Sequence, residues 1–164
     1  MLSISSELTL KEGYEKFVQD GDLEAEIPWI VQMFEHPRSP LSFPGSLPLF
    51  EHDCIHVLCG RNKSLYDEAF VIGMTMGNDR STGWLHLFLF KVIAQFLYPK
   101  QYRFNPEHLI AFDLGFNYGR RVLKKFHDCN IKDLLNHPIQ QLRHTFGIDI
   151  AELSMLYKVE GLLS

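Results

Sequence analysis

Two histidines one helical turn apart have the spacing in this sequence that is best suited to chemistry. His52 and His56 differ by four positions. Each residue of an α-helix turns by about 100°, so both imidazoles lie on one helix face. Such a pair can reach one metal ion at about 2 Å from each ring nitrogen. The His-Glu-x-x-His helix of metalloproteases has the same spacing. We therefore expect these histidines to bind a divalent metal.

Asp53 occupies the second position of that motif. Its side chain is one methylene shorter than Glu, which makes it a poorer base for water on a distant metal. It is a better direct ligand, or a better partner of a ligand. A small metal-dependent hydrolase is an alternative that stays open. A peptidase would require Glu at position 53, and a phosphohydrolase of the His-Asp kind would require a further upstream His and downstream Asp. His36 and Asp113 are the loose candidates for these.

Glu68 lies in a segment that is otherwise apolar almost all round, which predicts a buried helix. A lone buried carboxylate costs several kcal/mol unless it is paired. The segment contains no Lys or Arg, and the short loop 59–63 folds it back beside the histidines, so we expect a metal as the partner. Pairing of Glu68 with Arg61 or Lys63 is the alternative.

Two imidazoles and two carboxylates suit Zn²⁺, Mn²⁺ or Fe²⁺ and tolerate Mg²⁺, and we expect zinc first. Four protein ligands would close a tetrahedral zinc site. If three coordinate, a position stays open for substrate, and the remaining carboxylate, Asp53 or Glu68, can act as acid or base. Cys59 follows His56 on the same face and could be a soft ligand, although a core thiol is the expected role.

Caps, prolines and glycines predict that the elements positioning these groups are helices. No segment alternates with period two, so the sequence predicts one all-α domain over residues 1–164, a multi-helix bundle with the metal site between two helices. Gly115 and Gly119, four apart, are expected to let another helix approach closely. The expected helices cover about 9–20, 23–35, 48–60, 65–76, 83–98, 105–126, 130–136, 138–147 and 149–163.

Composition indicates which partners and which cellular location to expect. Sixteen Lys and Arg against 20 Asp and Glu, with no long basic run, disfavour nucleic acid as a partner. Three cysteines without a Cys-x-x-Cys motif favour a reducing, cytoplasmic setting. The N-terminus has the pattern of neither a signal peptide nor a transit peptide. The most apolar stretch, 84–98, is too short to cross a bilayer and carries Lys91, so we expect it to form a buried helix.

The spacing His52-Asp53-x-x-His56, followed by eleven residues and then Glu68, resembles the signature of the coenzyme Q biosynthesis protein 4 family. The resemblance covers about residues 47–148, and a C-terminal helix at about 149–163 is additional. Three further stretches match in the same order: Leu58-x-Gly60, Phe116-x-x-Gly119-Arg120, and Pro138-Ile139-Gln140-Gln141-Leu142-Arg143 closed by Phe146-Gly147-Ile148.

The resemblance implies an all-α fold, a divalent metal on the four positions named above, and an apolar channel for a polyisoprenoid tail. It also implies a role in ubiquinone biosynthesis at the membrane surface, associated with metal-dependent oxidative decarboxylation at C1 of a polyprenylated benzoate-type ring. Partner enzymes of the pathway and a homodimer fit this role. The residues expected to bind the substrate are Phe70, Met74, Phe112, Phe116 and Arg120.

A protein that is not an enzyme is the other alternative. Such a chain would be a scaffold that binds polyisoprenoid intermediates for partner enzymes, and its metal would be structural. Lipid that copurifies with the protein, without turnover, would favour this alternative.

Overall fold

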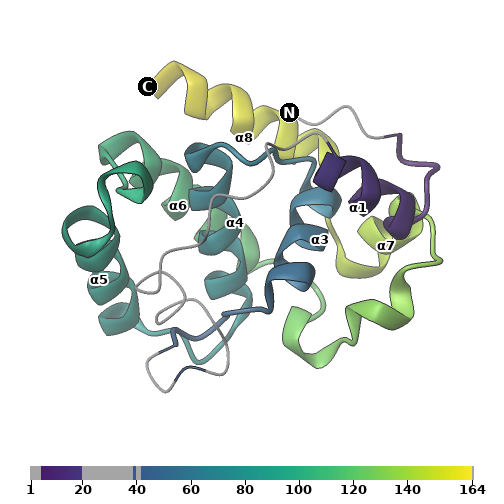
Figure 1. Cartoon of the computed structure of the whole chain (residues 1–164), viewed down its shortest axis with the longest axis horizontal. Coiled ribbons are helices and arrows are strands. Elements are labelled where there is room, and N and C mark those ends of the chain that lie inside the picture. Colours follow the sequence, from purple (N-terminus) through teal and green to yellow (C-terminus); the bar gives the residue numbers. More distant parts are fainter. Residues whose placement is uncertain (1–4, 20–38, 40–41, 164) are drawn as a thin grey trace.

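The computed structural model describes residues 5–19, 39 and 42–163, and the regular structure of these residues is helical (Figure 1). The predicted all-α, single-domain bundle is confirmed. The helix expected at 23–35 lies outside the described residues. The α-helices are α1 (Leu10–Gln19), α3 (Leu49–Cys59), α4 (Leu65–Asn78), α5 (Trp84–Val92), α6 (Pro106–Gly119), α7 (Ile139–Phe146) and α8 (Ile150–Leu163). Four short turns complete the order: the π-helical η1 (Ile93–Leu97) and the 3-10 helices η2 (Lys100–Tyr102), η3 (Phe126–Asp128) and η4 (Ile131–Leu134).

Helices α4 and α6 make the most extensive contact of any two elements, and glycines allow it. Gly73 and Gly77 on α4 face backbone carbonyls of α6, and Gly115 and Gly119 on α6 face backbone carbonyls of α4. A Cβ at any of the four would overlap the carbonyl oxygen opposite. The expectation that Gly115 and Gly119 admit a neighbouring helix is therefore confirmed, and α4 has a matching glycine pair of its own.

Capping residues begin the helices where the sequence places them. Thr9 and Glu12 form a reciprocal box at the start of α1, with the Thr9 N–H donating to the Glu12 carboxylate over 2.8 Å. The Ser64 hydroxyl accepts from the Asp67 N–H, which begins α4. Asp149 accepts from two N–H groups at the start of α8. These local hydrogen bonds fix the helix starts because they involve residues only two or three positions apart.

The end of α6 was predicted wrongly. The sequence predicts a helix to about Phe126, whereas α6 ends at Gly119. The Asn78 side chain donates to the Lys124 carbonyl and accepts from the Phe126 N–H, so this part of the chain bonds to the end of α4 instead of to its own helix. The helix expected at 130–136 is likewise reduced to the 3-10 turn η4.

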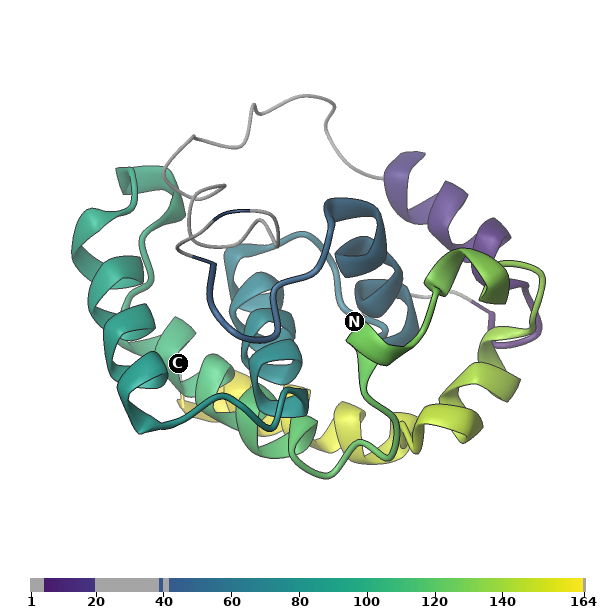
Figure 2. The same ribbon diagram turned by 90° about the horizontal axis from the view of Figure 1, so that it is seen from below.

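Helix α5 corrects a second prediction, because it is not buried. It lies at one end of the molecule, with α7 at the other (Figures 1 and 2). In the described part of the chain, one side of α5 and η1 packs on the protein, where the Phe90 ring stacks on Phe112 with centroids 4.8 Å apart. Six large apolar side chains of this segment are exposed: Trp84, Leu85, Phe88, Leu89, Phe96 and Leu97.

Candidate metal centre

Helix α3 is fixed at its C-terminal end, close to the histidines. Gly60 ends the helix with a left-handed backbone (φ 66°), and the Arg61 N–H donates to the His56 carbonyl over 2.9 Å. From α7, the buried Arg143 guanidinium donates to the carbonyls of Leu58 (2.8 Å) and Val57 (3.3 Å). The last carbonyls of α3 therefore have partners, and the turn that carries His56 is held from two directions.

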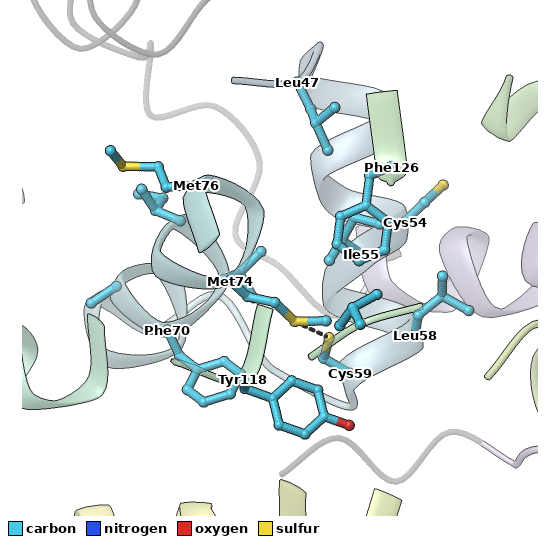
Figure 3. Close-up of a cluster of buried hydrophobic side chains, with 14 of the residues drawn as sticks. Leu47, Cys54, Ile55, Leu58, Cys59, Phe70, Met74, Met76, Tyr118 and Phe126 are labelled. Atoms are coloured by element: carbon cyan, nitrogen blue, oxygen red, sulfur yellow. Dashed lines mark hydrogen bonds between the residues drawn. The ribbon is translucent and has the colours of Figure 1, made fainter. Parts of the chain in front are cut away.

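The contact between α3 and α4 is a packed apolar core (Figure 3). Met74 of α4 points toward Cys59 of α3, and their sulfur atoms lie 3.2 Å apart. Ile55 and Leu58 on α3 and Phe70 on α4 are fully buried in the same cluster. This packing sets the distance between the helix that carries both histidines and the first turn of α4, which carries Glu68.

His52, His56 and Glu68 come together at this contact. The His52 Nε2 lies 3.0 Å from the Glu68 Oε2, and the His56 Nε2 lies 3.3 Å from the Glu68 Oε1. The two Nε2 atoms are 3.1 Å apart. Within the described residues, these three side chains form the one group of His, Cys, Asp and Glu whose ligand atoms are close enough together to hold a metal ion.

The distance between the two Nε2 atoms is close to one edge of a tetrahedral site, and each Nε2 lies at a similar distance from a different oxygen of the Glu68 carboxylate. With bonds of about 2.0–2.1 Å, ligand atoms on tetrahedral zinc are separated by about 3.3 Å. Each Nε2 and the carboxylate can offer a lone pair, and such atoms at 3.0–3.3 Å repel one another unless protons or a cation lie between them. The donor set fits a divalent metal of borderline hardness with three protein ligands and a fourth position open.

The surroundings of the three ligands are unequal. The His56 side chain is fully buried, its Nδ1 has no hydrogen-bond partner in the described structure, and its ring stacks on Phe17 with centroids 5.4 Å apart. The Glu68 side chain is 31% exposed, so it is less buried than its apolar helix predicts, and that of His52 is 15% exposed. The group is therefore closed on the His56 side and accessible from the Glu68 side.

The electrostatics of Glu68 follow from its neighbours. Burial by itself raises the pKa of this carboxyl, but the attraction of His56 and the hydrogen bonds from both imidazoles outweigh burial. The pKa of Glu68 therefore lies well below its ordinary value. The carboxylate is charged at neutral pH, as a metal ligand must be.

Asp53, expected as a fourth ligand, does not join this group. It lies close enough to interact electrostatically with His52, His56 and Glu68, and burial raises the pKa of its carboxyl above the ordinary value. Asp53 therefore lies near the group formed by His52, His56 and Glu68 but contributes no ligand atom to it.

The alternative partners for Glu68 are engaged elsewhere. Arg61 is fully buried, and its guanidinium binds Glu160 through two hydrogen bonds of 2.6 and 2.7 Å. The Lys63 ammonium lies over the Phe17 ring, 4.7 Å from its centroid. Among the described residues, neither forms an ion pair with Glu68.

No family model matches the chain, and neither a curated protein nor a solved structure is significantly similar to it. The motifs that suggested a family nevertheless occupy related places. Gly60 ends α3, Gly119 packs on a carbonyl of α4, and Arg143 donates to the carbonyls that end α3. Each of these three residues lies at the end of α3 or contacts α3 or α4, the two helices that carry the candidate ligands.

Cys59 has the role of a core thiol. It is fully buried against Met74, burial raises its pKa to about 12, and it is not part of the ligand group. A thiol that retains its proton is a poor metal ligand.

The residues expected to bind a substrate lie around the contact of α4 with α6. Phe70, Met74 and Phe112 are fully buried, and Phe116 is partly buried. The Arg120 guanidinium donates to the backbone carbonyls of Asp79 and Thr82, and it lies 4.9 Å from the centroid of the Phe116 ring. These contacts give each side chain a packing role, and substrate binding by them stays a prediction.

Sequence reasoning missed two residues that shape the site. Phe17 on α1 covers the His56 ring, and Glu160 on α8 binds Arg61, which the sequence offers as a partner for Glu68. An apolar position of α1 gave a weak signal for Phe17. Nothing in the sequence links Arg61 to a carboxylate 99 positions away.

Proposed function

We propose that this chain is a metal-dependent enzyme of prenylquinone biosynthesis that binds a divalent cation, zinc in the first place, through His52, His56 and Glu68. The observation that carries the proposal is that the two Nε2 atoms lie 3.1 Å apart and face the Glu68 carboxylate, whose two oxygens lie 3.0 and 3.3 Å from them. The resemblance described above supports the choice of a polyprenylated benzoate-type ring as substrate and of the membrane surface as the place of action.

The reaction that fits this site is loss of the carboxyl group at ring C1. The bond between C1 and the carboxyl carbon breaks, CO₂ leaves, and a proton takes its place on the ring. In the oxidative form a hydroxyl group replaces the carboxyl: one oxygen atom of dioxygen is added to the ring, and the other leaves as water with two electrons and two protons from an external two-electron reductant. When bound, the metal supplies Lewis acidity that stabilises negative charge on the substrate.

The protein's own groups divide the remaining tasks. The fully buried His56 anchors the site, while the partly exposed His52 and Glu68 border the side from which a substrate can approach. Asp53, beside the ligands but outside their group, is the candidate for holding the proton that is delivered to the ring. The Glu68 carboxylate supplies the negative charge of the ligand set.

Elemental analysis and turnover test this proposal together. Protein purified without chelator should contain about one zinc per chain, and His56→Ala and Glu68→Gln should lose it. Asp53→Asn should keep the metal but release CO₂ from a polyprenylated hydroxybenzoate at least about 100-fold more slowly, the scale of a lost general acid. Glu152→Gln on α8, which removes a surface carboxylate, is the control and should change neither.

Unchanged metal content and turnover in Glu68→Gln would overturn the proposal. Retained metal and copurified lipid without any turnover, in every variant that keeps the metal, would favour the scaffold instead.

A further inference from the structure

Helix α5 and turn η1 expose a group of large apolar side chains, called here the apolar face. Six large side chains there are between 41% and 77% exposed: Trp84, Leu85, Phe88, Leu89, Phe96 and Leu97. On α5, Trp84, Leu85, Phe88 and Leu89 fall within an arc of about 140° at 100° per residue. Trp84 is the most exposed of the six at 77%. Exposed apolar patches of this kind on an otherwise polar surface mark an interaction site.

The charges along this segment have one sign. Residues 80–103 contain four Lys and Arg and no Asp or Glu, which leaves 12 Lys and Arg against 20 Asp and Glu in the rest of the chain. Arg80, Lys100 and Arg103 are exposed at the two ends of the apolar face. An acidic protein therefore carries a basic, aromatic segment at one end.

Two acids next to the segment in the described structure, Asp113 and Asp79, already have partners. The Lys91 ammonium lies 2.6 Å from the Asp113 carboxylate of α6. The Asp79 carboxylate accepts hydrogen bonds from Ser81 and from the Gly45 N–H. Among the described residues, no carboxylate forms an ion pair with Arg80, Lys100 or Arg103, and the Arg103 guanidinium donates a hydrogen bond to the Tyr98 carbonyl over 2.7 Å. Their positive charges can therefore attract a negatively charged partner.

A second copy of this chain is a poor occupant for the face. In a two-fold dimer the same patch meets itself, so the three exposed cations of one copy would approach those of the other. Like charges juxtaposed across an interface oppose association. The apolar stripe on α8, where Met155 is 66% exposed, has no such charge pattern and serves as a comparison.

We propose that α5 and η1 dock the protein on the surface of an anionic phospholipid bilayer. The segment has 14 residues, about 21 Å in length, and lies in the plane of the interface with its apolar side chains among the lipids and its end cations among the headgroups. No helix in the described part of the chain has the length and apolar character needed to traverse a bilayer. The inference rests on the proposed function and names the surface through which the protein would reach a membrane-embedded substrate.

Binding to vesicles is the test. The 164-residue chain should sediment with vesicles of phosphatidylcholine and phosphatidylglycerol, and at least about ten-fold less with phosphatidylcholine alone. Phe88→Glu should weaken binding at least about ten-fold, because the ring that would insert among the lipids is replaced by a charge. Met155→Glu changes an apolar residue of similar exposure on α8 (66% against 59% for Phe88), and this matched control should bind as the original protein does.

The cations and the indole give two further readouts. The double change Lys100→Gln and Arg103→Gln should weaken binding to the anionic vesicles about five-fold for each charge removed. In a Trp29→Phe background Trp84 is the remaining indole, because the chain has two tryptophans. Its emission should shift to the blue on vesicle addition and be quenched by brominated lipid.

Three results would overturn the inference. One is no binding to anionic vesicles, and another is equal loss in the Phe88→Glu and Met155→Glu proteins. The third is a wild-type dimer that Phe88→Glu dissociates without any vesicle binding, which would assign the face to a second copy. His56→Ala should bind vesicles normally and Phe88→Glu should keep its metal, so failure of this inference and failure of the metal proposal are distinguishable.

Discussion

Asp67 and Glu68 are neighbours in the first turn of α4, yet they belong to two different charged clusters. Asp67 lies 3.6 Å from the Arg61 guanidinium, whose main partner is Glu160. These three side chains are at most 2% exposed, and the Arg61 guanidinium also stacks on the Phe70 ring at 3.7 Å. Glu68 instead faces His52 and His56. Two adjacent carboxylates in one helical turn thus have different partners, a guanidinium for Asp67 and two imidazoles for Glu68.

The two clusters differ in where their positive charge comes from. The Arg61 cluster contains a permanent cation that forms two parallel hydrogen bonds with Glu160, so the protein neutralises the charge by itself. The His52 cluster contains imidazoles that are neutral above their pKa, so its carboxylate needs protons or an external cation. We therefore expect the Arg61 cluster, a closed ion pair whose charges balance within the protein, to stabilise the fold. We expect the His52 cluster, which is incomplete because it has no permanent cation, to bind a metal. This contrast can be tested.

Removing the internal cation should have the largest effect. Arg61→Met leaves two buried carboxylates without their partner, and we expect the free energy of unfolding to fall by about 3–5 kcal/mol. Arg121→Met removes a guanidinium from an exposed pair with Glu152 and should cost less than about 1 kcal/mol. Urea titration measures both. The folded fraction of Arg61→Met should still bind zinc, and loss of zinc by that fraction would show that the clusters are coupled.

The sequence predicted the ligand group better than the charge network. His52 and His56 follow from helical spacing, and Glu68 follows because a short loop returns α4 beside α3. The contact of Arg61 with Glu160 spans 99 positions and leaves no local pattern. The place of Asp53 outside the ligand group depends on side-chain directions that spacing does not fix.

The fold shows the same division between local and distant causes. Caps and left-handed glycines such as Gly60 and Gly147 gave the limits of several helices, because the hydrogen bonds involved are local. The end of α6 depends on Asn78, 46 positions from the Lys124 carbonyl to which it donates, and could not be read from its own segment. The exposure of α5 was missed because hydropathy predicts burial and does not identify what covers an apolar face.

The external cation should have the next largest effect. Zinc at 100 times its dissociation constant should raise the free energy of unfolding by about 2.7 kcal/mol. The gain should shrink on acidification, because imidazoles must lose their protons to bind metal. Thermal unfolding with zinc and with chelator measures it. His56→Ala should lose the gain and His144→Ala, on the surface of α7, should keep it. An equal gain in both variants would place zinc elsewhere.

The position of α4, which serves both clusters, should be sensitive to a single methyl group. Gly73→Ala places a Cβ against the Phe112 carbonyl of α6 and should destabilise the fold by about 1–3 kcal/mol or more. Gly161→Ala on α8 meets nothing within 4 Å and should be neutral or stabilise by up to about 1 kcal/mol. Urea titration compares them. A tolerated Gly73→Ala would mean that α4 and α6 can separate without loss of stability.

The smallest expected effect is a difference in pH dependence between Glu68 and Glu160. Burial is the largest influence on the pKa of both carboxyls, and it raises both. At Glu160, Arg61 does not fully offset burial, so the pKa is raised. At Glu68, the two imidazoles more than offset burial, so the pKa is lowered. A lowered pKa in the folded state contributes stability above about pH 4.5 that is lost on acidification. A raised pKa contributes stability below about pH 4.5 that is lost as the pH rises through the folded-state pKa.

In the presence of chelator, the stability difference between the wild-type protein and Glu68→Gln should therefore move in favour of the wild type as the pH rises from 3.5 to 5. The difference between the wild type and Glu160→Gln should move against the wild type as the pH rises from 4.5 to 7. Urea titration at a series of pH values measures both differences. Parallel slopes for the two variants would mean that both carboxylates are neutralised in the same way, and the contrast between a closed and an incomplete cluster would be lost.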